Sequence, residues 1–523
     1  MSFVKSLSKR ESETMDITLV SPRNYFLYTP LLPACATGTV EERSIVEPVR
    51  RVLNNKAAFF EALCQDINPE EKTIVACFPP GTGMDESCFK IPYDVLVVGV
   101  GSVNNTFGIE GVAENTFFFK SIDDANRLRR QVSECFERAA LPQTSQQERE
   151  RLLSFVIVGG GPTGVEVAAE LHDMMVDDLR KIYPDLVPYV RIRIIELQDH
   201  VLSTYDREIS NYTAQEFSRE GIDLVLNSRV ASVGRNCVTV VDSRKNETSD
   251  IPFGACVWAT GVAMHPLVKQ LQERLPEGTQ THFRSIVTDQ FCRVLGSGGS
   301  IYAVGDAATI QQEKALSHSA ELFDRADTSK DGKLQLGEVR EILRKSSEDY
   351  SHFAEHARFL DGKYGGLRRW NNMVGQLIRK KSGAVDSATP VSELQEDTEL
   401  DKEAFSEILS KIDQGLRALP ATAQVAKQQG EYVAKLLASG KAKPGQPISG
   451  MKPFRYGHKG SLAYVGRDKA VMDVPQFGPI FGYSAGVMWK GFETYSQISL
   501  RNIFLVSSDW VRTKVFGRDI SKV

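Results

Sequence analysis

The sequence predicts an α/β fold built on parallel sheets, and three segments support this prediction. Each segment is a short apolar run that ends in glycine, which is typical of strands buried inside a parallel sheet. The three runs cover residues 93–101, 155–159 and 301–305. Because the chain has 523 residues, we expect two or three domains with room for a substantial core.

The middle segment is a glycine loop between a strand and a helix. Residues 155–158 form the strand, Gly159, Gly161 and Gly164 follow at G-x-G-x-x-G spacing, and a helix is expected from residue 165 to 174. The glycines allow a tight turn, close approach of a pyrophosphate and close packing of helix on strand. The helix N-terminus attracts phosphate. This context favours a dinucleotide site over an unrelated glycine-rich turn.

An acidic residue completes the dinucleotide motif. Residues 191–196 are predicted to form the second strand, and Glu196 at its end can accept a hydrogen bond from the 2′-hydroxyl of an adenine ribose. Glu196 follows Gly164 by 32 residues, against about 20 in the usual motif, and a charged insert at 177–189 accounts for the difference. A carboxylate at this position favours NADH over NADPH.

Composition excludes several classes of protein. The net charge of −4 gives no basic excess that would indicate nucleic-acid binding. The eight cysteines form no C-x-x-C pair, which argues against a disulfide framework, a zinc site and a redox-active disulfide. No apolar run reaches about 18 residues, so we expect no membrane-spanning helix, and no signal peptide is visible.

The remaining segments extend the α/β pattern. Residues 301–308 form a strand that ends at Gly305 and Asp306, where a carboxylate can meet the ribityl chain of a flavin. The strand over 255–261 ends at Gly261. Further strands are expected at 16–20, 222–226 and 237–241, helices at 2–7, 125–140 and 419–437, a hairpin at 454–466, an apolar loop at 26–33 and a polar linker at 142–150.

Residues 327–338 match the calcium loop of an EF-hand. Oxygen ligands fall at every required position, a sharp turn is possible at Gly332, and a helix precedes the loop at 321–326. The predicted ligands are Asp327, Ser329, Asp331, Lys333 through its carbonyl group, Gln335 and Glu338. A second, degenerate loop over 393–404 has Ala404 at the closing position, and we expect it to be structural only.

The last stretch, residues 481–522, combines aromatic, apolar and basic residues at helical spacings. Such a pattern is typical of helices that lie in a membrane interface, although an amphipathic dimer or core helix has the same pattern. The residues are Trp489, Phe492, Ile503, Val506, Trp510 and Val515, interleaved with Lys490, Arg501, Arg512, Lys514 and Arg518.

Together these motifs resemble the type II NADH dehydrogenases, and within them the calcium-regulated mitochondrial branch that carries an EF-hand insertion. The resemblance covers nearly the whole chain. It rests on the motifs at 21–26, 29–33, 105–108, 159–166, 259–261, 305–306 and 423–428. It implies two Rossmann-like domains of the flavin disulfide reductase type, an inserted helical EF-hand region and a C-terminal amphipathic segment at a membrane surface.

The resemblance also implies an activity, in which hydride passes from NADH to FAD and two electrons then reduce a ubiquinone-like quinone without proton pumping. It places Glu166 beside the nicotinamide as the catalytic residue. Its implied location is peripheral, on the intermembrane-space face of the mitochondrial inner membrane, and it is compatible with a homodimer. The cofactor-binding residues would be Gly159, Gly161, Gly164, Glu196 and Gly261 for NADH, Arg23, Thr29, Pro30, Gly305 and Asp306 for FAD, and Gln424 and Gln428 in the flavin–quinone pocket.

Two departures from the family pattern leave alternatives open. The first strand of the flavin domain and its glycine loop are not found before residue 16, and Lys427 stands where some relatives carry histidine. A catalytically silent calcium-binding membrane protein is therefore one alternative, and another pyridine-nucleotide flavin oxidoreductase is the second. The expected regions are a flavin domain at 1–120, 286–311 and 416–472, an NADH domain at 121–285, the EF-hand insertion at 312–415 and membrane-associating helices at 473–523.

Overall fold

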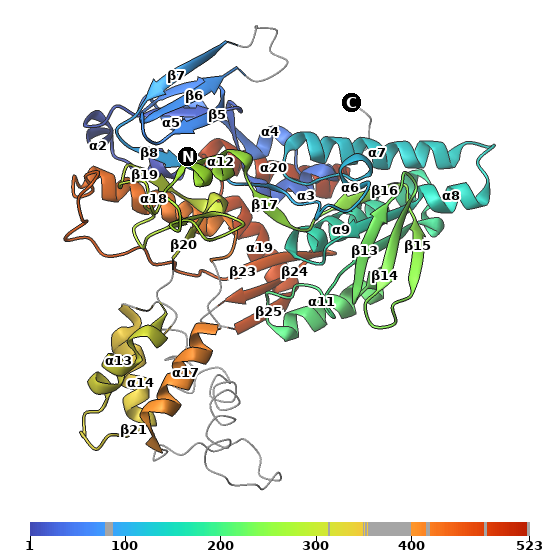
Figure 1. Cartoon of the computed structure of the whole chain (residues 1–523). Helices are drawn as coiled ribbons and strands as arrows, with labels where there is room; N and C mark the ends of the chain where they lie inside the picture. Colours follow the sequence, from blue (N-terminus) through green and yellow to red (C-terminus); the bar gives the residue numbers. More distant parts are fainter. Residues whose placement is uncertain are drawn as a thin grey trace.

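The structure is a computed structural model, and it describes residues 1–78, 87–311, 314–348, 350, 353, 399–414, 419–474 and 478–519. Most of the helices and strands gather in one body (Figure 1). Three helices lie apart from that body: α13 (Ser319–Ala326), α14 (Leu336–Lys345) and α17 (Lys402–Gln414).

A four-stranded parallel sheet forms the centre of the predicted nucleotide domain, and it confirms the α/β prediction. Its order is β12 (Ile222–Val225), β11 (Arg191–Ile195), β10 (Ser154–Val158) and β16 (Ala255–Trp258). All five residues of β10 are buried because the strand lies inside the sheet and both faces of the sheet are covered, which explains the unbroken apolar run in the sequence.

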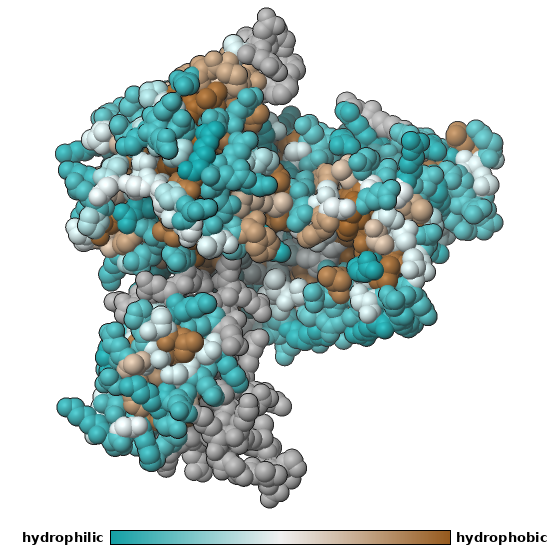
Figure 2. All heavy atoms as spheres, in the orientation of Figure 1, coloured by the Kyte–Doolittle hydropathy of each residue, from teal (hydrophilic) through white to brown (hydrophobic). Residues whose placement is uncertain are grey.

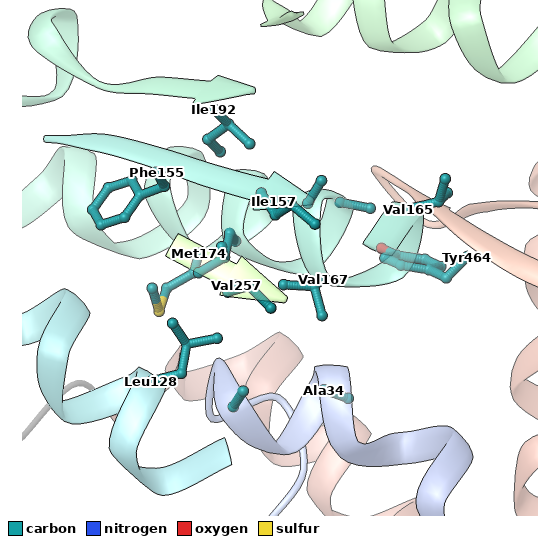
Figure 3. Packing of buried hydrophobic residues seen from close by; sticks show 14 of the residues in the cluster. Ala34, Leu128, Phe155, Ile157, Val165, Val167, Met174, Ile192, Val257 and Tyr464 are labelled. Carbon is teal, nitrogen blue, oxygen red and sulfur yellow. The ribbon is translucent and has the colours of Figure 1, made fainter. Parts of the chain in front are cut away.

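Helices α7 (Ile122–Ala140) and α9 (Pro162–Met174) contribute to the largest core of the molecule. Helix α7 begins with a capping box, in which Ser121 and Asp124 each accept a hydrogen bond from the other's backbone N–H. Figure 3 shows the packing of Leu128 from α7 and Met174 from α9 with strand residues such as Ile157. Helix α11 (Arg207–Glu220) contacts β12, and β13 (Ser228–Val233), β14 (Cys237–Asp242) and β15 (Thr248–Pro252) form a separate antiparallel sheet (Figure 1).

The predicted flavin domain has several short sheets. Its three parallel pairs among the described residues are β1 (Thr18–Ser21) with β4 (Ala58–Glu61), β8 (Leu96–Val98) with β19 (Ile301–Ala303), and β18 (Ile286–Thr288) with β20 (Ala308–Ile310). Strands β5 (Leu63–Asn68), β6 (Thr73–Cys77) and β7 (Cys88–Pro92) form an antiparallel sheet. Helix α1 (Ser2–Ser6) packs against α18 (Ala423–Ala438), which brings residues from opposite ends of the sequence together.

The C-terminal region combines an antiparallel sheet with two helices. The sheet consists of β23 (Ser461–Gly466), β24 (Lys469–Val474) and β25 (Gly478–Gly482), and the helices are α19 (Tyr483–Tyr495) and α20 (Leu500–Phe516). Trp489 of α19 stacks on Tyr464 of β23, with ring centroids 5.0 Å apart. Among the described helices none is both long and apolar enough to cross a membrane.

The three separate helices share a hydrophobic core of their own. Strand β21 (Leu334–Gln335) pairs with β22 (Glu399–Leu400), so Leu400, which belongs to the predicted second loop, lies opposite Leu334. Residues 393–398 of that loop lie outside the described residues. The shared core includes Leu322, Phe323, Leu334, Val339, Ile342, Leu400, Phe405 and Ile408.

Three sequence predictions are corrected by the structure. The linker at 142–150 contains α8 (Gln146–Leu152), which Ser145 caps through its side chain. The hairpin joins β23 to β24, because the segment before Ser461 bonds to α18 instead of to a strand. Cys77 and Cys88 form a disulfide, since β6 and β7 bring their Cα atoms within 4.1 Å, and spacing along the sequence does not reveal this pairing.

Candidate active site

The glycine loop at the start of α9 has the conformation that the motif requires. Gly159 has a φ of +110°, and a Cβ atom on Gly164 would lie 1.9 Å from the carbonyl oxygen of Gly159. A Cβ atom on Gly161 would meet nothing within 4 Å, so the space in front of the helix N-terminus is open there. The loop can therefore receive a phosphate group at the positive end of α9.

Glu196 lies directly after β11 and contacts the glycine loop. Its Oε2 accepts a hydrogen bond from the Gly160 N–H at 2.6 Å, and its Oε1 accepts one from the Gln198 N–H at 2.8 Å. A carboxylate has about four lone-pair sites, so capacity remains for ribose hydroxyls. The long insert before β11 is irregular and contains η2 (Met175–Leu179), α10 (Arg180–Ile182) and η3 (Val187–Tyr189).

Glu166 lies in the second turn of α9, and the C-terminal region covers it. Its Oε1 accepts a hydrogen bond from the Tyr464 N–H at 3.1 Å, and the Trp489 side chain also bonds to it. Burial raises the pKa of Glu166 well above its ordinary value, and the nearby carboxylates of Glu493 and Glu170 raise it further. A proton is therefore retained on this group at a pH where an exposed glutamate is ionised.

Glu170, one turn further along α9, is bound by two separate segments. Thr37 and Thr39 donate hydrogen bonds to its Oε2 at 3.0 Å and 2.6 Å. Arg518, near the C-terminus, approaches the same oxygen at 3.9 Å and bonds to Asp178 at 2.9 Å. Burial raises the pKa of Glu170, and the Arg518 guanidinium opposes this effect.

Gly305 and Asp306 lie where β19 ends, in η4 (Gly305–Ala307). The Oδ2 of Asp306 accepts a hydrogen bond from Ser102 at 3.0 Å, and Lys120 donates to the same serine at 3.0 Å. A Cβ atom on the neighbouring Gly101 would meet nothing within 4 Å. Asp306, Ser102 and Lys120 thus form a hydrogen-bonded polar cluster next to Gly101, and such groups suit the hydroxylated chain of a flavin.

Gly261, on the predicted nucleotide side of the site, packs against the loop that contains Phe107. Its φ is +75°, and a Cβ atom there would lie 2.4 Å from the ring of Phe107, so any other residue would displace that ring. On the predicted flavin side, Thr29 and Pro30 lie in η1 (Thr29–Leu31), and Arg23 lies over the Tyr25 ring at 6.0 Å. Tyr25 also lines a cavity of about 820 Å³ together with Asn24, Arg43 and Arg50.

Gln424 and Gln428, predicted to line a quinone pocket, each form hydrogen bonds with the backbone of the segment before β23. Gln424 donates to the Gly460 carbonyl at 2.9 Å, and Gln428 both donates to and accepts from Gly457 at 2.9 Å. Gln429 was not predicted from the sequence; its side chain is 1% exposed and accepts a hydrogen bond from the Gly305 N–H at 2.7 Å. The helical spacing from Val425 to Gln429 and Val433 could have placed Gln429 on the buried face.

The predicted calcium loop is folded around its own carboxylates. Asp327 accepts the Gly332 N–H at 3.0 Å, Asp331 accepts the Lys333 N–H at 2.9 Å, and Glu338 accepts the Gln335 N–H at 3.1 Å. Gly332 has a φ of +78°, as position 6 of such a loop requires. Within the described ranges, no three His, Cys, Asp or Glu residues are gathered closely enough to hold a metal ion.

The fold and site define a class of protein, the pyridine-nucleotide oxidoreductases. Residues 1–326 match the family described as pyridine nucleotide-disulphide oxidoreductase, and residues 458–519 match the NDH2 C-terminal domain. The structure of NDH2 from Plasmodium falciparum in complex with NADH is similar, with a TM-score of 0.80 and 26% identity over 99% of this chain and 97% of that one. Sulfide:quinone oxidoreductase from Aquifex aeolicus shares the fold, with a TM-score of 0.59 and 14% identity over 99% of this chain and 93% of that one.

Similar proteins with assigned names identify the family within this class. The external alternative NAD(P)H-ubiquinone oxidoreductase B2, mitochondrial, of Arabidopsis thaliana is 37% identical over 100% of this chain and 88% of its own length. The external alternative NADH-ubiquinone oxidoreductase, mitochondrial, of Yarrowia lipolytica is 33% identical over 99% of this chain and 78% of its own length. The chain belongs to the type II NADH dehydrogenase family, which confirms the resemblance inferred from its motifs.

Proposed function

We propose that this protein oxidises NADH and reduces a ubiquinone-like quinone at a membrane surface, with FAD as its bound cofactor. The supporting observation is that α9 carries both the nucleotide-binding loop and the predicted catalytic residue. Its N-terminus opens on the phosphate-binding glycine loop, and its second turn carries the half-buried Glu166. The names of the relatives in Arabidopsis and Yarrowia support the same donor and acceptor.

In this proposal each residue has a defined task. The glycine loop binds the pyrophosphate of NADH, Glu196 accepts from the adenine ribose, and Asp306 accepts from a ribityl hydroxyl. The chemistry that FAD supplies when bound is hydride acceptance from NADH, followed by two-electron reduction of the quinone. Glu166 holds a proton beside the reacting groups, and hydrogen bonds from the Tyr464 N–H and the Trp489 side chain fix its position.

The proposal is tested with purified protein, NADH and a short-chain ubiquinone. We expect a yellow protein with a flavin absorbance spectrum, consuming NADH and quinone in equal amounts. Glu166→Gln should lower the turnover number by about 100-fold, the usual contribution of a positioned acid or base. A colourless protein that oxidises no NADH would contradict the proposal and favour the catalytically silent alternative.

The attachment to a membrane is proposed from α19 and α20. Both helices bury one side against the body, at Trp489 and Val506, and expose apolar residues on the other. The exposed set is Val487, Met488, Phe492, Tyr495, Leu500, Phe504, Val511, Val515 and Phe516. Such a surface suits the headgroup region of a bilayer, here the mitochondrial inner membrane on its intermembrane-space face, and the same surface would serve in a homodimer.

Calcium binding is proposed for the loop from Asp327 to Glu338. The support is the turn at Gly332 together with carboxylates that already draw backbone N–H groups inward. The surrounding surface in this view is largely hydrophilic (Figure 2). Only Asp327, Asp331 and Glu338 supply charge, so we expect a dissociation constant of about 10⁻⁶ to 10⁻⁴ M.

A further inference from the structure

Helix α19 carries an acidic residue on its buried side, directly beneath its apolar surface. Glu493 is 5% exposed, whereas Val487 and Tyr495 on the opposite side are 73% and 84% exposed. A glutamate at this depth is unusual because desolvation of a carboxylate is costly. Helix α19 therefore places an ionisable group between its exposed apolar surface and the candidate active site.

The surroundings of Glu493 connect it to the site already described. Tyr28, which directly precedes the η1 turn, forms a hydrogen bond with it, and Glu166 of α9 is close enough for their charges to interact. Trp489, one turn earlier on α19, bonds to Glu166. Among the described residues, the Oε2 atom of Glu493 is buried and has no hydrogen-bond partner.

An unpartnered buried carboxylate oxygen calls for a proton or a polar ligand. Within the described part of the chain, no arginine or lysine forms an ion pair with Glu493. Lys490, three residues earlier on α19, pairs with Asp468 at 2.6 Å instead. The buried Oε2 atom is therefore stabilised by carrying a proton.

We propose that Glu493 delivers the proton that quinone reduction consumes, passing it to the site beside Glu166. This inference rests on the proposed function. NADH gives up a hydride, which carries one proton and two electrons, while a quinone gains two protons and two electrons to become a quinol. Each turnover therefore takes one further proton, which leaves the Glu493 carboxyl group and is replaced from water.

The electrostatics of the site suit this role. Burial raises the pKa of Glu493 to about 7, with the hydrogen bond from Tyr28 acting in the opposite direction. A group with a pKa near the working pH both donates and regains a proton readily. The protonated acid is the active form, so the rate of quinone reduction should fall as the pH rises through about 7.

The test compares two electron acceptors in the flavin-loaded protein. Ferricyanide takes electrons without protons, whereas ubiquinone needs both. We expect Glu493→Gln to reduce ubiquinone about 100-fold more slowly and to lose the decline above pH 7, while its ferricyanide rate stays within about twofold of the parent. Glu208→Gln, an exposed carboxylate at the start of α11, is the matched control and should leave both rates unchanged.

Infrared spectroscopy tests the proposal independently of turnover. In the parent protein, infrared difference spectra should show a carboxylic acid C=O band that disappears near pH 7, and Glu493→Gln should lack this band. Glu493→Asp should restore part of the pH dependence. An unchanged ubiquinone rate and pH profile in Glu493→Gln would refute the role of Glu493 alone, whereas a parent protein that reduces ferricyanide but not ubiquinone would refute the proposed function.

Discussion

Glu196 should decide which nicotinamide cofactor the protein uses, and Glu196→Gln tests this. Its carboxylate is fixed by the Gly160 and Gln198 N–H groups at 2.6 Å and 2.8 Å, so it cannot easily turn away from an incoming phosphate. With an effective dielectric constant near 20, a unit charge on the 2′-phosphate at about 5 Å is repelled by about 3 kcal/mol. Together with the lost ribose hydrogen bond, NADPH should be disfavoured by about 2–4 kcal/mol, or about 30- to 1000-fold.

The assay is kcat/KM with NADH and with NADPH at neutral pH, for the parent protein and Glu196→Gln. The variant should lose most of the preference, because an amide does not repel phosphate. It should also lose about 1 kcal/mol of stability, since its single carbonyl oxygen can accept only one of the two N–H groups. Glu208→Gln controls for the change of net charge. Equal efficiencies in the parent protein, or an unchanged ratio in the variant, would refute the assignment.

Three further changes have defined outcomes. Glu338→Gln should abolish calcium binding measured by calorimetry and leave NADH oxidation intact, and tight binding by the variant would exclude the EF-hand. Phe504→Glu with Val511→Glu, which alters side chains 72% and 66% exposed, should release the protein from anionic liposomes in a flotation assay without lowering its Tm. Because the pKa of Glu493 rises from about 4.5 unfolded to about 7 folded, its ionisation costs stability as the pH rises between these values. The advantage of Glu493→Gln in free energy of unfolding should therefore grow by about 3 kcal/mol from pH 4 to pH 8, and a constant difference would count against the buried acid.

The nucleotide half of the site could be predicted from sequence because its signals are local. The strand, the glycines and the helix of 155–174 are contiguous, and the structure reproduces them as β10 and α9. Glu196 was found by its place at the end of a strand, although the irregular η2–η3 insert lengthens the motif. Short-range periodicity and a steric need for glycine are properties that a single segment can display.

The proximity of Tyr28, Glu166 and Glu493 could not be predicted in the same way. Tyr28, Glu166 and Glu493 come from three distant segments, and no local pattern marks any of them as a neighbour of the others. The same limit hides the partners of Gln424 and Gln428, whose amides bond to backbone groups of the distant segment at 457–460. It also explains the Cys77–Cys88 disulfide, because strand register sets which residues lie opposite one another.

The position of Arg518 has a practical consequence for handling the protein. This side chain is 7% exposed and lies among Glu170, Asp177 and Asp178. Loss of one partner from a buried ion pair commonly costs about 3–5 kcal/mol, since the opposite charge stays buried. Carboxypeptidase trimming or a premature stop codon just before Arg518 would remove the positive charge that stabilises Glu170 of α9 and Asp178. Samples should therefore carry purification tags elsewhere, and an intact-mass measurement of the C-terminus should precede any kinetic comparison.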